Sequence, residues 1–192
     1  MSTETKSVIG AVALILGLAL VGYVTVGFAG VLFSVAFVGG LTLWLLTTYR
    51  TPIDPQTIIV PYLVTVILFI VHVYEEFVAH VEHQLTKLSG LPVTQTDFLV
   101  IAAFSAPIVW LLGAVMVLKR WAFGYFFVST FLFGMMFAEL SHFFSPFMES
   151  GTFHYSPGMY TAILPVIGGW YEMSKERNNA GPDEAAPGRA AP

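Results

Sequence analysis

The chain has 192 residues, of which 56% are hydrophobic and 10% are charged, and its formal net charge at pH 7 is −4. Soluble domains carry about 25% charged residues, so this composition excludes a soluble globular domain and is typical of an integral membrane protein. There is no cysteine, which excludes disulfides, thiolate nucleophiles and thiolate metal ligands.

Apolar segments long enough to cross a membrane follow one another along most of the chain. A span needs about 20 apolar residues. Residues 8–46 contain no charged residue, which leaves room for two spans with a turn at residues 27–30. Four further spans are expected at residues 57–83, 98–118, 121–144 and 158–171. The predicted fold is therefore an all-α polytopic transmembrane helix bundle of about six spans.

The basic residues predict an orientation for this bundle. With six spans and a cytoplasmic N-terminus, seven of the eight lysines and arginines are cytoplasmic and only Lys87 lies outside. Cytoplasmic loops are enriched in these residues, so both termini are expected in the cytoplasm. The polar start MSTETKS has no signal-peptide cleavage site after it, and no cleavable signal is expected. Residues 174–192 are polar and rich in Pro, Gly and Ala, which predicts a disordered tail.

The third predicted span ends in VHVYEEFVAHVEH, which contains three histidines and three glutamates. Residues three and four apart share a helix face, so one stripe of this span is expected to be ionisable. Ionisable groups in hydrocarbon are costly and usually functional. The expected members of the stripe are His72, Glu75, Glu76 and His83, with His80 at its edge. Glu82 is expected to be a solvated residue at the end of the helix.

The fifth predicted span carries a second pair, Glu139 and His142, whose spacing again puts both groups on one face. Both odd-numbered spans run outward, and at 1.5 Å per residue His72 lies about 22 Å and Glu139 about 27 Å along its span. The loop after the fifth span brings His154 and Tyr155 to the same side, where Tyr155, Pro157 and Gly158 are expected to form a cap over the layer. These groups are therefore expected in one layer, in the extracytoplasmic half of the bilayer.

The carboxylates of this layer need a neutralising group. Neither the third nor the fifth predicted span contains a lysine or an arginine. A buried carboxylate without such a partner takes up a proton or is neutralised in another way. The neutralising group is a metal ion, a protonated histidine or a proton on the glutamates themselves. A network of structural hydrogen bonds between helices is the remaining alternative.

Histidines and glutamates on facing helices are the ligands of di-iron sites in helix bundles and of zinc sites with two histidines and one glutamate. The expected cofactor is therefore a divalent metal ion, iron or zinc. The candidate metal ligands are His72, Glu76, Glu139 and His142. The candidate catalytic residues are His72, Glu75, Glu76 and Glu139. Additional candidates are His80, His83, His154 and Tyr155.

The sequence HVYEE at residues 72–76 resembles the H-x-x-E-E motif of an uncharacterised family of integral membrane proteins, the HXXEE family. The later segment HYSPGMYTA is similar to another motif of that family. The resemblance covers roughly residues 62–171. It implies a four-span core at residues 57–173 preceded by a two-span addition at 1–50, the whole forming one bundle at 1–173. It also implies a membrane protein suspected of being an enzyme.

In its arrangement of histidine and glutamate on two spans, the chain is also similar to the emopamil-binding sterol isomerases. Their chemistry needs no metal, because an acid protonates an alkene and a base removes a proton from the resulting cation. This resemblance implies acid and base roles for His72, Glu76 and Glu139.

Three functions follow from the choices of neutralising group. The first is a membrane-embedded, metal-dependent hydrolase or oxidoreductase acting on a lipid-like or small hydrophobic substrate. The second is a metal-free acid–base isomerase of a sterol- or isoprenoid-like lipid. The third is a non-enzymatic ion- or proton-handling transporter or accessory membrane subunit. The expected partners are the bilayer and a hydrophobic molecule, not nucleic acid, and the short loops favour a bacterial or archaeal plasma membrane.

Overall fold

The computed structural model describes residues 3–26 and 28–180, and all regular structure within these ranges is helical. The elements in chain order are α1 Thr3–Val26, α2 Phe28–Leu46, α3 Pro55–Val78, α4 Glu82–Ser89, α5 Gln95–Phe98, the π-helical segment η1 Leu99–Ser105, α6 Ala106–Leu118, α7 Ala122–Phe133, the π-helical segment η2 Gly134–Ala138, α8 Ser141–Ser150 and α9 Ile163–Ala180. The all-α prediction is confirmed for this part of the chain.

Four helical segments are long and apolar enough to cross a membrane. They are Thr5–Val24, Pro55–Val78, Gln95–Leu118 and Ala122–Phe147. The longest apolar part of α2 for which side chains are described is shorter, at Ser34–Leu46, and α9 is apolar only in its first half. The helices therefore have the composition and the length of an integral membrane protein.

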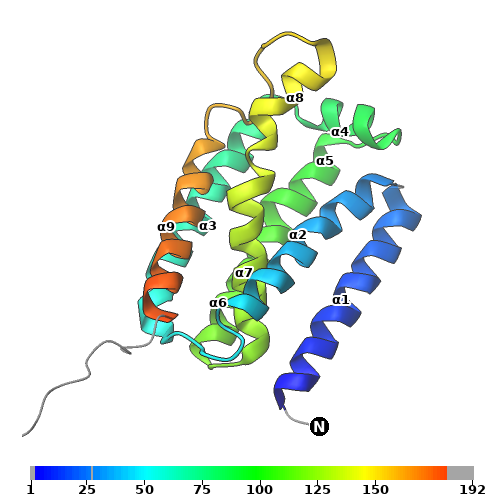
Figure 1. The fold of residues 1–192 in the computed structure, drawn as a ribbon. Helices are drawn as coiled ribbons and strands as arrows, with labels where there is room; N and C mark the ends of the chain where they lie inside the picture. The colour runs from blue at the N-terminus through cyan, green and yellow to red at the C-terminus, as the bar shows by residue number, and fades with distance from the viewer. Residues whose placement is uncertain (1–2, 27, 181–192) are drawn as a thin grey trace, which may run out of the picture.

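The helices form a bundle in which α7 occupies a central position (Figure 1). Helix α7 packs against α2, α6 and α1, and α3 packs against α9 and α6. The short helices α4 and α8 lie at one end of the bundle, and α1 begins and α9 ends at the opposite end (Figure 1).

Aromatic side chains fill the centre of the bundle, where α2, α3 and α7 meet. Trp44, Tyr62, Phe126 and Phe131 are each at most 1% exposed. The outer faces are apolar as well, and Leu16, for example, is 66% exposed. A bundle whose outer surface is as apolar as its core is suited to lipid rather than to water.

The third predicted span is shorter than the sequence suggested. Helix α3 ends at Val78 rather than at residue 83, because His80 adopts a left-handed backbone conformation with φ of 58°. The Val81 N–H then donates to the Glu76 carbonyl over 3.0 Å, which closes the helix end. Glycine usually occupies such a position, and because histidine stands here instead, no stop signal is visible in the sequence. The prediction that His83 shares the stripe of His72 is therefore wrong.

The last two predicted spans also differ in their limits. The fifth continues beyond residue 144 through α8 to Ser150, where Gly151 ends it with φ of 72°. The sixth begins at Ile163 instead of residue 158, because residues 157–162 form turns. Helix α9 runs to Ala180, so residues 174–180 of the predicted disordered tail are helical. The remainder of that tail lies outside the described residues. So does Gly27 of the predicted first turn, but residues 28–30 of that turn already belong to α2, so the prediction of a turn there is wrong.

Candidate metal centre

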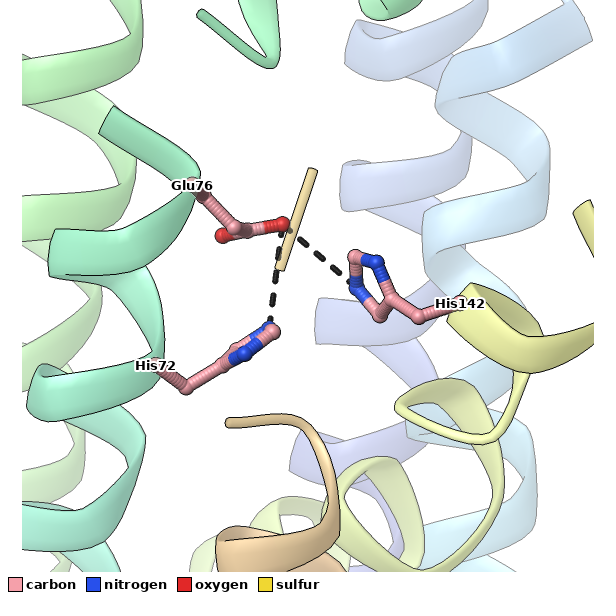
Figure 2. A group of neighbouring side chains, drawn as sticks. All are labelled: His72, Glu76 and His142. Carbon is pink, nitrogen blue, oxygen red and sulfur yellow. Dashed lines mark ion pairs between the residues drawn. The ribbon is translucent and has the colours of Figure 1, made fainter. Parts of the chain in front are cut away.

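Two residues of α3, one helical turn apart, form one half of a buried His/Glu group. His72 is 1% exposed and the Glu76 side chain is 14% exposed. Figure 2 shows both side chains pointing away from α3 toward His142, with the Glu76 carboxylate facing the two imidazole rings. The spacing of four residues places them on one face, as the sequence predicts.

The other half comes from Glu139, directly after η2, and from His142 in the first turn of α8. The π-helical segment η2 inserts an extra residue into one turn, and the Glu139 N–H bonds to the Gly134 carbonyl five residues earlier. Such insertions are frequent at functional sites because they change the direction in which the following residues point. Glu139 and His142, which follow η2, both face α3. The side chain of Glu139 is 10% exposed and that of His142 is 14% exposed.

Four side-chain atoms converge between these two segments. His72 Nε2 lies 2.8 Å from Glu139 Oε2 and 3.7 Å from Glu76 Oε1. His142 Nε2 lies 3.5 Å from Glu76 Oε1 and 3.6 Å from Glu139 Oε2. We call His72, Glu76, Glu139 and His142 the inner centre. The structure thus brings together the four residues that the sequence singled out as metal ligands.

The tautomers of the two histidines follow from the partners of their Nδ1 atoms. His142 Nδ1 lies 2.8 Å from the Pro157 carbonyl oxygen, which only accepts, so Nδ1 carries the proton. The Thr161 hydroxyl donates its one proton to Glu75 over 2.6 Å, so it accepts from His72 Nδ1 at 3.3 Å. In the neutral rings both Nε2 atoms therefore present lone pairs to the two carboxylates.

Glu75 belongs to a separate arrangement beside the inner centre. Its carboxylate accepts hydrogen bonds from the Tyr155 hydroxyl at 2.8 Å and from the Tyr160 N–H at 3.2 Å. The N–H and hydroxyl of Thr161 add bonds of 2.7 and 2.6 Å. With its oxygens engaged in this way, Glu75 holds the segment between α8 and α9 and is not directed at the other glutamates.

The same arrangement changes the acidity of Tyr155. Partial burial, together with the hydrogen bond to Glu75 and the negative charge of that carboxylate, raises the pKa of Tyr155 to about 12. The phenol consequently stays protonated and continues to donate to Glu75 at every physiological pH.

Gly158 lies in the segment between α8 and α9, residues 151–162, which we call the covering segment. It lies directly against the inner centre. It has φ of 85°, and a Cβ at this position would lie 2.7 Å from His72 Cε1 and 2.9 Å from both Glu76 Cγ and His142 Cε1. Only a residue without a side chain therefore fits here, and the backbone of the segment closes directly over the imidazoles.

Three residues of the inner centre form a group that could hold a metal ion. Zinc bonds of about 2.0–2.2 Å place neighbouring ligand atoms of a tetrahedral site about 3.3–3.6 Å apart. Three of the four nitrogen–oxygen separations are 3.5 to 3.7 Å, and the fourth, between His72 and Glu139, is a hydrogen-bond distance of 2.8 Å. One ligand atom each from His72, Glu76 and His142 lies within 4.8 Å of the others. The carbonyl and hydroxyl partners of Nδ1 are the groups that commonly orient metal-binding histidines.

The additional candidates lie apart from the inner centre. His80 and His83 are 58% and 78% exposed and form a second group with Glu82. His154 is exposed, and its Nδ1 lies 3.1 Å from the Thr152 carbonyl oxygen. The expectation that Glu82 is solvated is wrong, because its residue is only 4% exposed. Glu82 is the first residue of α4 and lies at the corner between α3 and α4, two residues after the left-handed His80.

Sequence reasoning missed two residues. Thr161 reaches His72 and Glu75 through the path of a loop, which residue spacing does not reveal, whereas Pro157 and Gly158 were expected beside Tyr155 as a cap over the layer and do contact it. Glu172 on α9 was also missed, although it is fully buried. The sequence around it, GGWYEMSK, is typical of the end of a helix at a membrane surface, where a glutamate is normally exposed. The Glu172 side chain is buried because α9 packs against α3. The SPG sequence before Met159 was the one available sign of a tight turn.

Comparisons with protein-family models, with curated proteins and with solved structures gave no match for this chain. The resemblances to the HXXEE family and to the sterol isomerases therefore stay hypotheses. The functional argument rests on the geometry of the inner centre.

Proposed function

We propose that this chain is a membrane-embedded, metal-dependent enzyme whose inner centre holds one divalent ion, zinc or iron. The observation that carries the proposal is the convergence of two imidazole lone pairs and two buried carboxylates on one point. Atoms that all carry lone pairs repel one another unless a metal ion or a proton lies between them. We assign that role to a metal ion taken up from solution.

The charge balance supports a divalent ion. The inner centre contains two carboxylates, and the sequence has no lysine or arginine from residue 55 to 86 or from residue 121 to 174. Two negative charges in a low-dielectric region are strongly unfavourable. Two neutral imidazoles and one ion of charge +2 make the whole group neutral, which requires no shift of protons onto the glutamates.

The side chains then divide into two roles. His72, Glu76, Glu139 and His142 hold the ion, while Glu75 positions the covering segment through Tyr155, Tyr160 and Thr161. A bound zinc ion supplies Lewis-acid activation of water, and a bound iron ion supplies oxygen chemistry. Gly158 and its neighbours exclude bulk solvent from the imidazoles.

A groove beside the covering segment supports an apolar, lipid-like substrate. It has a volume of about 460 Å³, within the range of small-molecule sites, and is lined by Phe143, Phe153, Tyr155, Met159, Tyr160 and Ile163. Phe143 follows the ligand His142 in the chain, and Tyr155 and Tyr160 donate to Glu75. The groove therefore lies beside the inner centre, since one lining residue adjoins His142 in the chain and two others bond to Glu75, the neighbour of Glu76.

The same proposal includes six spans, with both termini in the cytoplasm and the inner centre in the extracytoplasmic half of a bacterial or archaeal plasma membrane. The start of α1 and the end of α9 at the same end of the bundle (Figure 1) support an even number of crossings. The basic residues support the orientation. Lys87, the one basic residue predicted to lie outside the cytoplasm, is in α4, at the end of the bundle opposite to the start of α1 (Figure 1).

The deciding experiment is elemental analysis of the purified full-length protein in detergent, after supplementation with zinc and iron and without chelators. We expect near-stoichiometric metal in the parent protein and its loss in a His142→Gln/Glu139→Gln variant. His154→Gln is the matched control, because His154 is a histidine of the same region outside the inner centre. Absence of metal from the correctly folded parent protein would overturn the proposal.

One observation favours a second function if no metal is found. His72 Nε2 and Glu139 Oε2 are 2.8 Å apart, which is hydrogen-bond distance and suits a proton shared between an acid and a base. The metal-free isomerase of a sterol- or isoprenoid-like lipid then becomes the better proposal. Its test is turnover of such lipids by the metal-free protein, abolished by Glu139→Gln.

A further inference from the structure

A second His/Glu group lies at the corner between α3 and α4 and has no part in the inner centre. It consists of His80, Glu82 and His83, which we call the corner group. We propose that the corner group binds one divalent transition-metal ion of its own, of the zinc class, taken directly from the solution on that side of the bundle.

The ligand atoms of the corner group lie close together in the structure. His80 Nδ1 lies 2.9 Å from Glu82 Oε1, and His83 Nε2 lies 4.0 Å from the same oxygen. One ligand atom from each residue falls within 4.8 Å of the other two. The imidazole rings are stacked, with centroids 5.7 Å apart and planes inclined by 19°. Two imidazoles and one carboxylate are a ligand set that zinc uses, with its fourth position left to water.

The backbone holds the two histidines in place. His80 has φ of 58°, a conformation that glycine or asparagine adopts far more readily. The turn is fixed on both sides, because Val81 is buried and donates to Glu76, and the His83 N–H donates to the His80 carbonyl over 3.2 Å. Histidine is one of the residues that adopt this conformation more readily than most, and here it leaves the His80 imidazole beside Glu82.

Glu82 adds an independent reason for a cation. Its side chain is only 5% exposed, and its Oε2 is buried without a hydrogen-bond partner among the residues that the structure describes. A buried carboxylate with one unsatisfied oxygen is unfavourable by itself. An ion held by Glu82 Oε1 and the two imidazoles does not bond to Oε2, but it offsets the negative charge that the buried carboxylate carries.

Access separates the corner group from the inner centre. The side chains of His80 and His83 are 58% and 78% exposed, whereas His72 is 1% exposed. An ion therefore reaches the corner without any movement of the segment that covers the inner centre. Since His80 precedes α4 and His83 lies within it, the bound ion also fastens α4 to the end of α3.

The test is a zinc titration of the full-length protein in detergent by calorimetry, combined with mass-spectrometric mapping of histidines protected from acylation. To isolate the corner, the titration uses the His142→Gln/Glu139→Gln background, in which the inner centre is disabled. We expect one zinc ion bound per chain, with His80 and His83 protected. A His80→Asn/His83→Gln change in that background removes two of the three ligands and should weaken zinc binding at least ~10-fold, which corresponds to at least ~1.4 kcal/mol.

The controls make the result specific. Asparagine tolerates the left-handed backbone at position 80, so the variant keeps the turn, and unchanged helical circular dichroism confirms the fold. His154→Gln removes another exposed histidine and should leave the titration unchanged. Equal zinc affinity with and without the corner histidines, or equal loss on His154→Gln, would overturn the proposal. Because the inner centre is absent from this background, failure here is distinct from failure of the proposed function.

Discussion

Because Gly158 has no side chain, the covering segment can lie close against the inner centre. The backbone of Gly158 has φ of 85° and lies against the imidazoles of His72 and His142. Gly151 at the end of α8 has a similar φ of 72°, but a Cβ there would meet nothing within 4 Å. The two glycines therefore share a backbone requirement and differ in their surroundings.

Gly158→Ala should reduce metal content and stability together. The left-handed conformation costs alanine about 1–2 kcal/mol at either position, and the added contact at position 158 costs a further ~1–3 kcal/mol. Thermal unfolding and elemental analysis of the two variants measure the difference. We expect Gly151→Ala to lose some stability and keep its metal. Equal behaviour of the two variants would contradict the close approach of Gly158 to the imidazoles.

At the scale of the helices, small residues set how closely α2 and α7 pack. A Cβ on Gly40 would overlap the Cα and the side chain of Thr130 on α7. On α1, by contrast, Gly17 faces open space, with no atom within 4 Å of an added Cβ. Small residues of this kind are the usual means by which membrane helices approach one another.

Gly40→Ala should therefore destabilise the bundle by about 1–3 kcal/mol, because α2 must move away from α7. Gly17→Ala should be neutral or stabilising by up to ~1 kcal/mol, since alanine is the better helix former. Unfolding of both variants in detergent, followed by circular dichroism, measures the two effects. A Gly40→Ala protein as stable as the parent would show that α2 and α7 are not in this contact.

The helices illustrate what residue patterns reveal and what they do not. Apolar length located α1, α3 and α7, and the basic pair at residues 119–120 marked the turn between α6 and α7. The end of α3 was missed because His80 stands where a glycine normally signals a stop. The extra residue of η2 was also invisible, since a π-helical turn has no composition of its own. Residue patterns therefore predict that a helix exists better than they predict where it ends and in which direction its side chains point.

For the whole molecule, the absence of cysteine in the sequence makes the orientation directly measurable. The connection between α2 and α3 and the connection between α8 and α9 lie at opposite ends of the bundle (Figure 1). Thr51 in the first and Thr152 in the second are both exposed. Single cysteines at these positions report on the two sides of the membrane without any background labelling.

We expect Thr152→Cys to react with a membrane-impermeant maleimide in intact cells, and Thr51→Cys to react only after the cells are lysed. This outcome follows from six spans with cytoplasmic termini, because positively charged loops stay inside. Labelling of both cysteines after lysis controls for their accessibility. The reverse pattern would contradict the orientation and would place the inner centre nearer the cytoplasm.

The inner centre was predictable as a set of residues but not as a structure. Helical spacing placed His72 with Glu76, and Glu139 with His142. The lack of lysine and arginine in the same spans indicated that the carboxylates of both pairs need another neutralising group. Their mutual distances depend on η2 and on the covering segment, which come from long-range packing. For the same reason the sequence grouped Glu75 with Glu76, although the structure gives Glu75 its own set of partners 80 to 86 residues away.

That separation along the chain has a consequence for how the protein is made. The ribosome delivers α3 to the bilayer well before Thr161, which bonds to Glu75 from a position 86 residues later. Until then His72 and Glu76 have only each other among their final partners and Glu75 has none, and such groups are unfavourable in lipid. We therefore expect the nascent helix to remain beside water or the insertion machinery until α8 and the segment before α9 arrive.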